Sequence, residues 1–121
     1  MKVYLAGPMT GYPNLNFPLF HSEAARLRAM GYVVVNPAEI NADPNAEWAA
    51  CLRNDIRALI ECAGIVLLPG YSSSRGALLE IYIAKALGMA RMDAHLAPAI
   101  LPSSVETQQS SESKSVDKRL V

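Results

Sequence analysis

Two acidic residues occupy helix positions where an unpaired carboxylate is unfavourable. In the helix expected over residues 75–87, Glu80 lies about 140° from Lys85 on the solvent side, because successive residues are about 100° apart. Glu80 therefore shares an arc with Ile83 and Ala84, and a carboxylate on an apolar face costs free energy unless a partner binds it. This position indicates a functional carboxylate. The alternative is a glutamate that only complements the helix dipole.

Asp55 repeats this anomaly in the preceding helix, which is expected over residues 46–62. The charged and polar residues of that helix share one arc: Glu47, Arg53, Asn54, Arg57 and Glu61. Asp55 instead falls in the apolar arc, between Trp48 and Cys62. A buried carboxylate must be satisfied. Asp55 is therefore either a second functional group or an aspartate paired with a backbone N–H or an arginine.

Two inward carboxylates favour a nucleophile paired with a proton donor. Glu80 stands about one and a half turns into its helix, where the positive helix end favours the ionised form. Asp55 stands late in its helix among apolar side chains, where desolvation favours the protonated form. We therefore expect Glu80 to be the nucleophile and Asp55 the proton donor. Such a pair suits cleavage at an acetal-like carbon through an oxocarbenium-like transition state.

The loop that leads into the last helix has the composition of an anion site. Residues 69–76 (PGYSSSRG) bring three serine hydroxyl groups, the guanidinium of Arg75 and unpaired helix N–H groups to one point. The loop is not a P-loop, because no Gly-Lys-Ser/Thr follows. An ordinary serine-rich turn is the alternative.

The first strand and its loop add three candidates. Gly7 and Gly11 permit a ligand to approach the backbone closely, although any tight turn would also use glycine. Tyr4 lies on the strand, from which its hydroxyl could reach Glu80, and a packed core tyrosine is the alternative.

The elements that position these residues alternate along the chain. Apolar runs without alternation are typical of parallel strands covered on both faces, and they occur at residues 3–6, 32–35 and 64–68. Helical patterns separate them, at residues 18–30, 46–62 and 75–87. A fourth strand is expected near residues 97–101. This order predicts an α/β fold, a Rossmann-like three-layer sandwich around a small parallel sheet, with ligands bound beyond the carboxyl ends of the strands.

Composition excludes several classes of protein. The chain has 121 residues, which suits one domain, and 11 basic against 11 acidic residues argue against a nucleic-acid partner. No apolar run is long enough for a membrane span, and the N-terminus lacks a signal-peptide pattern, so we expect a cytoplasmic protein. Two cysteines are too few for a disulfide scaffold, and His21 and His95 show no ligand spacing. We expect no metal and no organic cofactor.

The end of the chain differs from the rest. Residues 103–121 are rich in serine and contain no aromatic residue, so they cannot bury enough apolar surface to offset their ordering entropy. We predict a folded domain over residues 1–102 and a disordered tail over residues 103–121.

Several of these stretches together resemble the nucleoside 2-deoxyribosyltransferase-like superfamily, and most closely its small phage and prophage proteins. The matching stretches are residues 3–11 (VYLAGPMTG), 36–39 (NPAE), 53–56 (RNDI), 68–70 (LPG) and 74–80 (SRGALLE). The resemblance covers about residues 2–88 and implies a parallel Rossmann-like sheet. Relatives continue with an apolar strand after Gly88. Here MARMDAHL interrupts that pattern, which predicts a shorter sheet or an edge completed by a neighbouring subunit.

The resemblance also implies roles for the candidate residues. Glu80 matches the nucleophile that attacks the anomeric carbon, Asp55 the group that protonates the departing base, and Tyr4 the residue that orients the nucleophile. Two loops would bind the substrate: Gly7, Pro8, Met9, Thr10 and Gly11, and Ser74, Arg75 and Gly76. The activity implied is cleavage or transfer at an N-glycosidic bond by a homodimer or larger homo-oligomer. A nucleotide-binding module without turnover is the alternative.

One position bears on the substrate. Six residues before the nucleophile, transferases of free nucleosides tend to carry an aspartate, whereas 2′-deoxynucleoside 5′-phosphate N-hydrolases carry a serine. This chain has Ser74 there, followed by Arg75, and both would attract a phosphate. The resemblance therefore favours a nucleoside 5′-monophosphate. The first loop departs from those hydrolases, because Pro8 and Thr10 stand where they have a serine and an arginine.

Overall fold

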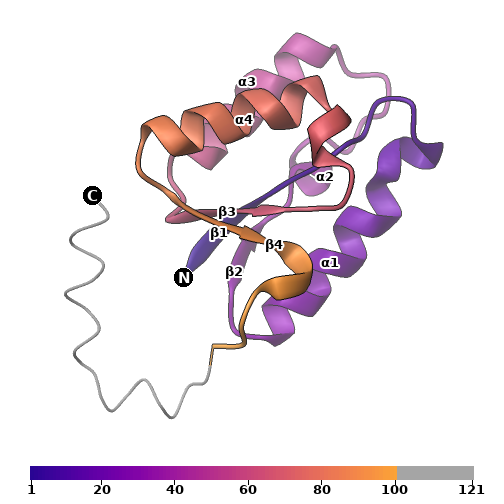
Figure 1. The fold of residues 1–121 in the computed structure, drawn as a ribbon. Helices are drawn as coiled ribbons and strands as arrows, with labels where there is room; N and C mark the ends of the chain where they lie inside the picture. The colour runs from indigo at the N-terminus through magenta and orange to yellow at the C-terminus, as the bar shows by residue number, and fades with distance from the viewer. Residues whose placement is uncertain (101–121) are drawn as a thin grey trace.

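The computed structural model describes residues 1–100, which form a four-stranded parallel sheet flanked by helices (Figure 1). The strands are β1 (Lys2–Ala6), β2 (Val33–Val35), β3 (Gly64–Leu67) and β4 (Ala90–Asp93), in the order β2-β1-β3-β4. The helices are α1 (Phe17–Ala29), α2 (Pro37–Ile40), α3 (Trp48–Leu59) and α4 (Arg75–Ala86). Three short 3₁₀ segments are η1 (Pro13–Asn16), η2 (Tyr71–Ser73) and η3 (Ala94–Leu96). The predicted α/β fold is confirmed.

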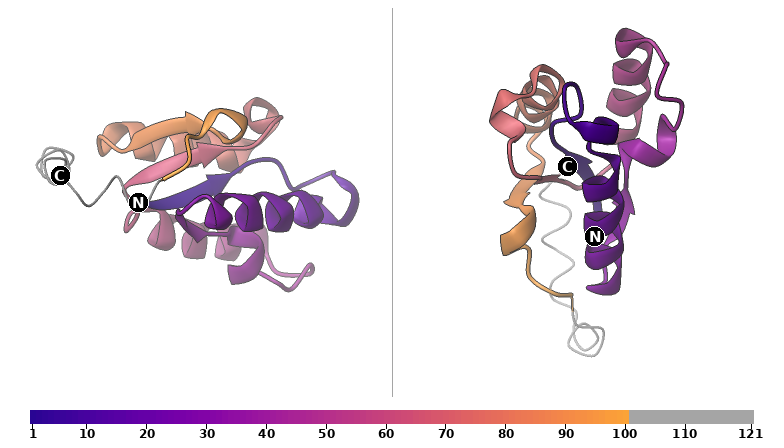
Figure 2. Two further views of the ribbon diagram at one scale, coloured as in Figure 1. Left: turned by 90° about the horizontal axis from the view of Figure 1, so that it is seen from below. Right: turned by 90° about the vertical axis from the view of Figure 1, so that its right-hand side faces the viewer.

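The sheet separates two helical layers. Strands β1 and β3 lie side by side at its centre (Figure 2), and their residues are apolar on both faces because helices cover both. Val3 and Leu5 of β1 face α1, whereas Tyr4 and Ala6 face the side of α3 and α4. In Figure 1, α3 and α4 lie above the sheet and α1 lies below it.

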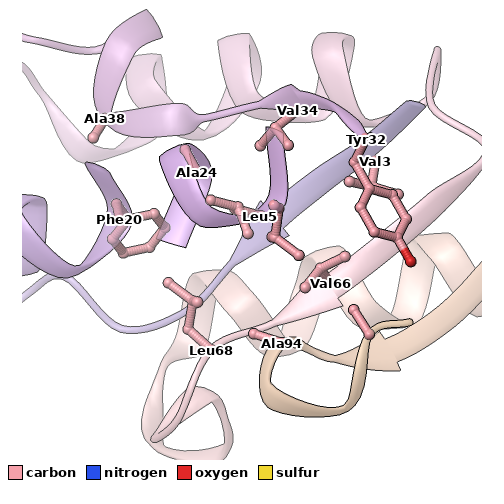
Figure 3. Packing of buried hydrophobic residues seen from close by; sticks show 12 residues of the cluster. Val3, Leu5, Phe20, Ala24, Tyr32, Val34, Ala38, Val66, Leu68 and Ala94 are labelled. Atoms are coloured by element: carbon pink, nitrogen blue, oxygen red, sulfur yellow. The ribbon is translucent and has the colours of Figure 1, made fainter. Parts of the chain in front are cut away.

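The α1 side of the sheet holds an apolar core. Phe20 of α1 packs against Leu5 and Leu68 (Figure 3), and Leu27 belongs to the same cluster; Phe20 and Leu27 are at most 1% exposed. Such a core stabilises a small domain through burial of apolar surface. This layer anchors the strands whose carboxyl ends carry the loops of the site.

The predicted elements before residue 88 are confirmed with shifts of one to three residues at their ends. The helix expected over residues 46–62 is shorter, at Trp48–Leu59, and the four-residue α2 was not predicted. Asn36 explains α2, because its side-chain Oδ1 accepts from the Ala38 N–H and so caps the short helix.

The fourth strand lies elsewhere than predicted. It is formed by Ala90–Asp93 inside the interrupted MARMDAHL segment, and it pairs with β3. An edge strand is buried less than a central one, so alternating small and polar residues suffice there. Residues 97–100 form no strand. Pro98 lacks an N–H donor, and the segment instead packs on α1, where the Ile100 N–H donates to the Met30 carbonyl over 2.7 Å.

The predicted serine-rich tail at residues 103–121, and the domain boundary at residue 102, lie outside the described residues. Within residues 1–100, no helix has the length and apolar character that a membrane span requires.

Candidate active site

A cavity of about 620 Å³ opens at the carboxyl ends of β1, β2 and β3. The loops after these strands form its walls, as expected for an open parallel sheet. Tyr4 on β1, Asp55 on α3 and Glu80 on α4 all line it. Three separate elements thus bring one hydroxyl and two carboxyl groups to one space.

Glu80 is held by Tyr4. The Tyr4 hydroxyl donates to Glu80 Oε2 over 2.8 Å, and Tyr4 and Glu80 are 0% and 5% exposed. Among the described residues, Glu80 Oε1 has no hydrogen-bond partner. The helical spacing correctly predicted this inward position, and the hydroxyl of Tyr4 does reach Glu80.

Asp55 is held from the loop after α2. The Asn41 side-chain amide donates to Asp55 Oδ1 over 2.6 Å, and Asp55 is 9% exposed. Within residues 1–100, Asp55 Oδ2 accepts no hydrogen bond. Each of these two cavity-lining carboxyl groups therefore has one oxygen without a hydrogen-bond partner among residues 1–100, and buried polar atoms of this kind call for a partner.

Burial controls the protonation of both acids. Desolvation raises the pKa of Glu80 to about 8, against the opposing effect of the Tyr4 hydrogen bond. Desolvation also raises the pKa of Asp55 to about 6, and the hydrogen bond from Asn41 limits that rise. This rise contradicts the prediction that the helix dipole keeps Glu80 ionised. The dipole acts at the helix terminus, whereas the Glu80 carboxyl is buried more completely than that of Asp55.

The loop before α4 presents donors to the cavity. Ser74 caps α4, its Oγ accepting from the Ala77 N–H over 3.1 Å, which leaves the hydroxyl hydrogen available to a ligand. The guanidinium of Arg75 lies 4.0 Å from the centroid of the Trp48 ring. This stacking holds the guanidinium at the cavity rim, next to the positive end of α4. Trp48 is thus a stacking residue as well as the first residue of α3.

The first loop is built differently from expectation. Gly7 is required by packing, since an added Cβ would come within 2.8 Å of the Leu68 Cβ. Gly11 adopts a φ of +87°, which glycine tolerates, and it is not among the residues that line the cavity. The loop ends in a left-handed turn in which Leu15 has a φ of +54°. Such a φ is unfavourable for leucine.

Most predicted site residues do meet at the cavity. Those that line it are Tyr4, Gly7, Pro8, Met9, Thr10, Asp55, Ser74, Arg75, Gly76 and Glu80. Sequence reasoning missed Asn41, Asp43 and the half-buried Cys51, which also line the cavity. The signal for Asn41 was its place in the loop after the second strand. Its partner could not be inferred, because residues 41 and 55 meet only in the fold.

The fold and the cavity define an α/β protein with two buried carboxyl groups at the carboxyl edge of a parallel sheet. The chain belongs to the family described as a domain of unknown function, DUF4406, whose model matches residues 1–93. No curated protein matches the chain. Within the described residues, no three His, Cys, Asp or Glu side chains form a group suited to a metal ion.

A solved structure shares the fold. It is that of a 2-deoxyribosyltransferase from the psychrotolerant bacterium Bacillus psychrosaccharolyticus, with a TM-score of 0.60 and 22% sequence identity. The similarity covers 77% of this chain and 71% of that chain. At this level of identity the likeness establishes the arrangement of strands and helices.

Proposed function

We propose that this protein cleaves or transfers the N-glycosidic bond of a nucleoside or nucleoside 5′-monophosphate through a covalent glycosyl-Glu80 intermediate. The observation that carries the proposal is the pair of buried carboxyl groups, Glu80 and Asp55, each with one unpartnered oxygen at the same cavity. Two carboxyl groups flanking a bond to an anomeric carbon are the standard equipment for displacement through an oxocarbenium-like transition state. The shared fold with a 2-deoxyribosyltransferase supports the same reaction class.

In the proposed reaction, the Glu80 carboxylate attacks the anomeric carbon while the glycosidic C–N bond breaks. The bonding electrons pass to the base, and Asp55 delivers its proton to the base nitrogen. Water or a second base then attacks the anomeric carbon, Asp55 takes up the proton of that nucleophile, and the ester bond to Glu80 breaks. Water makes the protein a hydrolase, and a base makes it a transferase.

The mechanism requires that Glu80 and Asp55 together carry one proton. Between a pKa of about 6 for Asp55 and about 8 for Glu80, one of the two groups is protonated and the other ionised. The higher pKa favours Glu80 as the holder of that proton, so the proposed mechanism requires substrate binding to shift the proton to Asp55. Tyr4 favours the loss of the proton from Glu80, because its hydrogen bond to Oε2 lowers the pKa of Glu80 and so stabilises the carboxylate that the shift creates.

We propose a 5′-monophosphate as the preferred form of the substrate. The Ser74 hydroxyl, the Arg75 guanidinium and the first N–H groups of α4 converge at the rim. Trp48 is the sole tryptophan of the chain and contacts Arg75, so its fluorescence reports binding there. We expect a deoxynucleoside 5′-monophosphate to change this fluorescence at a lower concentration than the free nucleoside. Equal or tighter binding of the nucleoside contradicts the preference.

We propose that the chain forms a homo-oligomer through the outer face of α4. That face is apolar, with Leu78, Leu79 and Tyr82 at 47%, 40% and 71% exposed, while the helix buries Glu80. An outward apolar face on a helix is typical of a protein interface. Sedimentation velocity of the wild type and of Tyr82→Glu tests this. The substitution is expected to produce monomers, and a wild type that is monomeric contradicts it.

The function is tested by the release of free base from a panel of nucleosides and their 5′-monophosphates. Wild-type protein is expected to release base, and Glu80→Gln to lose at least about a thousandfold in rate because it cannot form the ester. Glu47→Gln, at an exposed position, is the control. Tight binding without any base release would favour a nucleotide-binding module. Release by Glu80→Gln at the wild-type rate contradicts the mechanism.

A further inference from the structure

A chain of side-chain hydrogen bonds connects the protein surface to Asp55. Arg57 Nη1 donates to Asn54 Oδ1 over 2.9 Å, Asn54 Nδ2 donates to Asn41 Oδ1 over 3.3 Å, and Asn41 Nδ2 donates to Asp55 Oδ1 over 2.6 Å. Arg57 and Asn54 are exposed on α3, Asn41 is half-buried, and Asp55 is buried. All bonds of the chain point in one direction, from the cation inward to the carboxyl group.

This chain fixes the orientation of the Asn41 amide. Both groups of that amide are engaged, because Nδ2 also donates weakly to the Pro37 carbonyl over 3.4 Å. A flipped amide would turn its oxygen toward the Asp55 carboxyl and the Pro37 carbonyl, and its nitrogen toward the Asn54 amide nitrogen. Each of those contacts would be repulsive, since an amide oxygen only accepts and an NH₂ group only donates. Asn54 is oriented in the same way by Arg57, whose guanidinium can only donate.

The consequence for Asp55 is an inequality between its two oxygens. Oδ1 already accepts a short hydrogen bond, so a proton on Oδ1 would oppose the Asn41 N–H. Oδ2 has no partner within residues 1–100, and Asp55 lines the cavity. A proton on this carboxyl group is therefore placed on Oδ2, where a bound molecule meets it.

We propose that Asn41 is the positioning residue of the site: held by Asn54 and Arg57, its amide assigns the proton of Asp55 to Oδ2 and stabilises the charge left on Oδ1 once that proton is transferred. This inference rests on the proposed function for its catalytic meaning, because there Asp55 is the proton donor. A hydrogen bond to a carboxylate is stronger than one to the neutral acid. The chain therefore favours the products of proton transfer more than the reactants.

The other groups around Asp55 cannot replace Asn41. Tyr4 on β1 gives its hydrogen to Glu80 Oε2 and also lies close enough to Asp55 to lower its pKa, whereas the charge of Asp55 raises the pKa of Glu80 on α4. Cys51, one turn earlier on α3, also lies close enough to interact with the Asp55 charge. None of these groups is cationic, so the nearest cation acting through hydrogen bonds is Arg57.

The first test follows the titration of Asp55 by carboxyl ¹³C NMR and needs no substrate. The chain contains four aspartates, and loss of one signal in Asp55→Asn assigns it. Asn41→Ala is expected to raise the midpoint by about one pH unit, as loss of a hydrogen bond to a carboxylate implies. Arg57→Met is expected to raise it by a smaller amount, because it removes only the polarisation of the chain. An unchanged midpoint in Asn41→Ala overturns the proposal.

The matched control is Arg53→Met. Arg53 and Arg57 stand two residues before and two residues after Asp55 on the same helix, and both are exposed. Both substitutions remove one positive charge, but only Arg57→Met removes a hydrogen bond of the series that leads to Asp55. Arg57→Lys keeps a donor and is expected to restore the wild-type titration. Equal midpoints for Arg53→Met and Arg57→Met overturn the proposal even where Asn41→Ala fails to fold.

The second test separates this inference from the function on which it rests. If base release occurs, Asn41→Ala is expected to lower kcat about tenfold or more and to leave KM nearly unchanged. A rise in KM with unchanged kcat would place Asn41 in ligand binding and overturn its positioning role. A different outcome is a wild type that releases no base while the titration midpoint of Asp55 still depends on Asn41. That result would reject the proposed function, but it would retain the role of the hydrogen-bond chain in setting the charge of Asp55.

Discussion

The two sides of the sheet differ in what they bury. On the α1 side, the buried residues are mostly apolar and include large ones such as Phe20 (Figure 3) and Leu27. On the side of α3 and α4, two carboxyl groups and a tyrosine hydroxyl lie beside an apolar cluster that includes Leu59 and Ile65, whereas Leu78 and Tyr82 face outward. The first arrangement stabilises the fold. The second costs stability, and a fold retains such a cost where the buried groups act on a ligand.

The largest expected effect is a gain of stability from Glu80→Gln at alkaline pH. The folded chain keeps the Glu80 proton up to a pKa of about 8, whereas the ordinary pKa of glutamate, which applies in the unfolded chain, is 4.5. The unfolded state thus binds fewer protons between these values, so wild-type stability falls as pH rises through this window. Glutamine does not titrate. The free energy of unfolding of the variant is expected to exceed that of the wild type by on the order of 5 kcal/mol above pH 8 and by nearly nothing at pH 4.

Urea unfolding at several pH values measures this gain, with the exposed Glu47→Gln as control. A variant that is less stable than the wild type at pH 9 would show that Glu80 stabilises the fold. The contrast between the two sides of the sheet would then be false.

On the other side of the sheet, truncation is expected to destabilise. Phe20→Ala removes a 1% exposed ring from the α1 core and is expected to cost about 4 kcal/mol at every pH. Val33→Ala, at a 60% exposed position on β2, is the control and is expected to cost less than about 1 kcal/mol. Denaturant unfolding of both variants measures the difference. Equal costs would mean that the α1 layer is not the stabilising one.

The protonation of the site predicts a bell-shaped dependence of base release on pH. Below a pKa of about 6 both acids are protonated, so no nucleophile is present, and above a pKa of about 8 both are ionised, so no proton donor is present. The rate is expected to fall about tenfold per pH unit outside this window. Initial rates across the pH range measure it. A rate that keeps rising above pH 9 contradicts the requirement for a proton donor.

The smallest expected effect on stability concerns Leu15 in the loop after β1, which borders the cavity. Leu15 adopts left-handed backbone angles, which asparagine tolerates better than leucine. Leu15→Asn is therefore expected to stabilise the protein by about 0.5 kcal/mol. The β-branched variant Leu15→Ile is expected to destabilise it by at least about 1 kcal/mol. Thermal unfolding compares them, and the same sign for both would exclude backbone strain as the cause.

Patterns within one element were readable from the sequence. Uninterrupted apolar runs identified the central strands because both of their faces are covered, and helical spacing identified Glu80 and Asp55 as inward residues. The edge strand Ala90–Asp93 was misplaced because an edge is half-buried and has no strong pattern. Apart from the Tyr4–Glu80 pair, features that depend on two distant segments were not readable. The contact of Asn41 with Asp55 and the greater burial of Glu80 arise only when three strands bring their loops together.

The most direct test of the central claim is intact-mass spectrometry of the protein quenched in acid during reaction with a deoxynucleoside 5′-monophosphate. We predict an added mass equal to the deoxyribosyl phosphate group, located on Glu80 by peptide mapping and absent from Glu80→Gln. Asp55→Asn is expected to reduce the rate of its formation. Base release without any adduct on Glu80, or an adduct on another residue, would contradict the account.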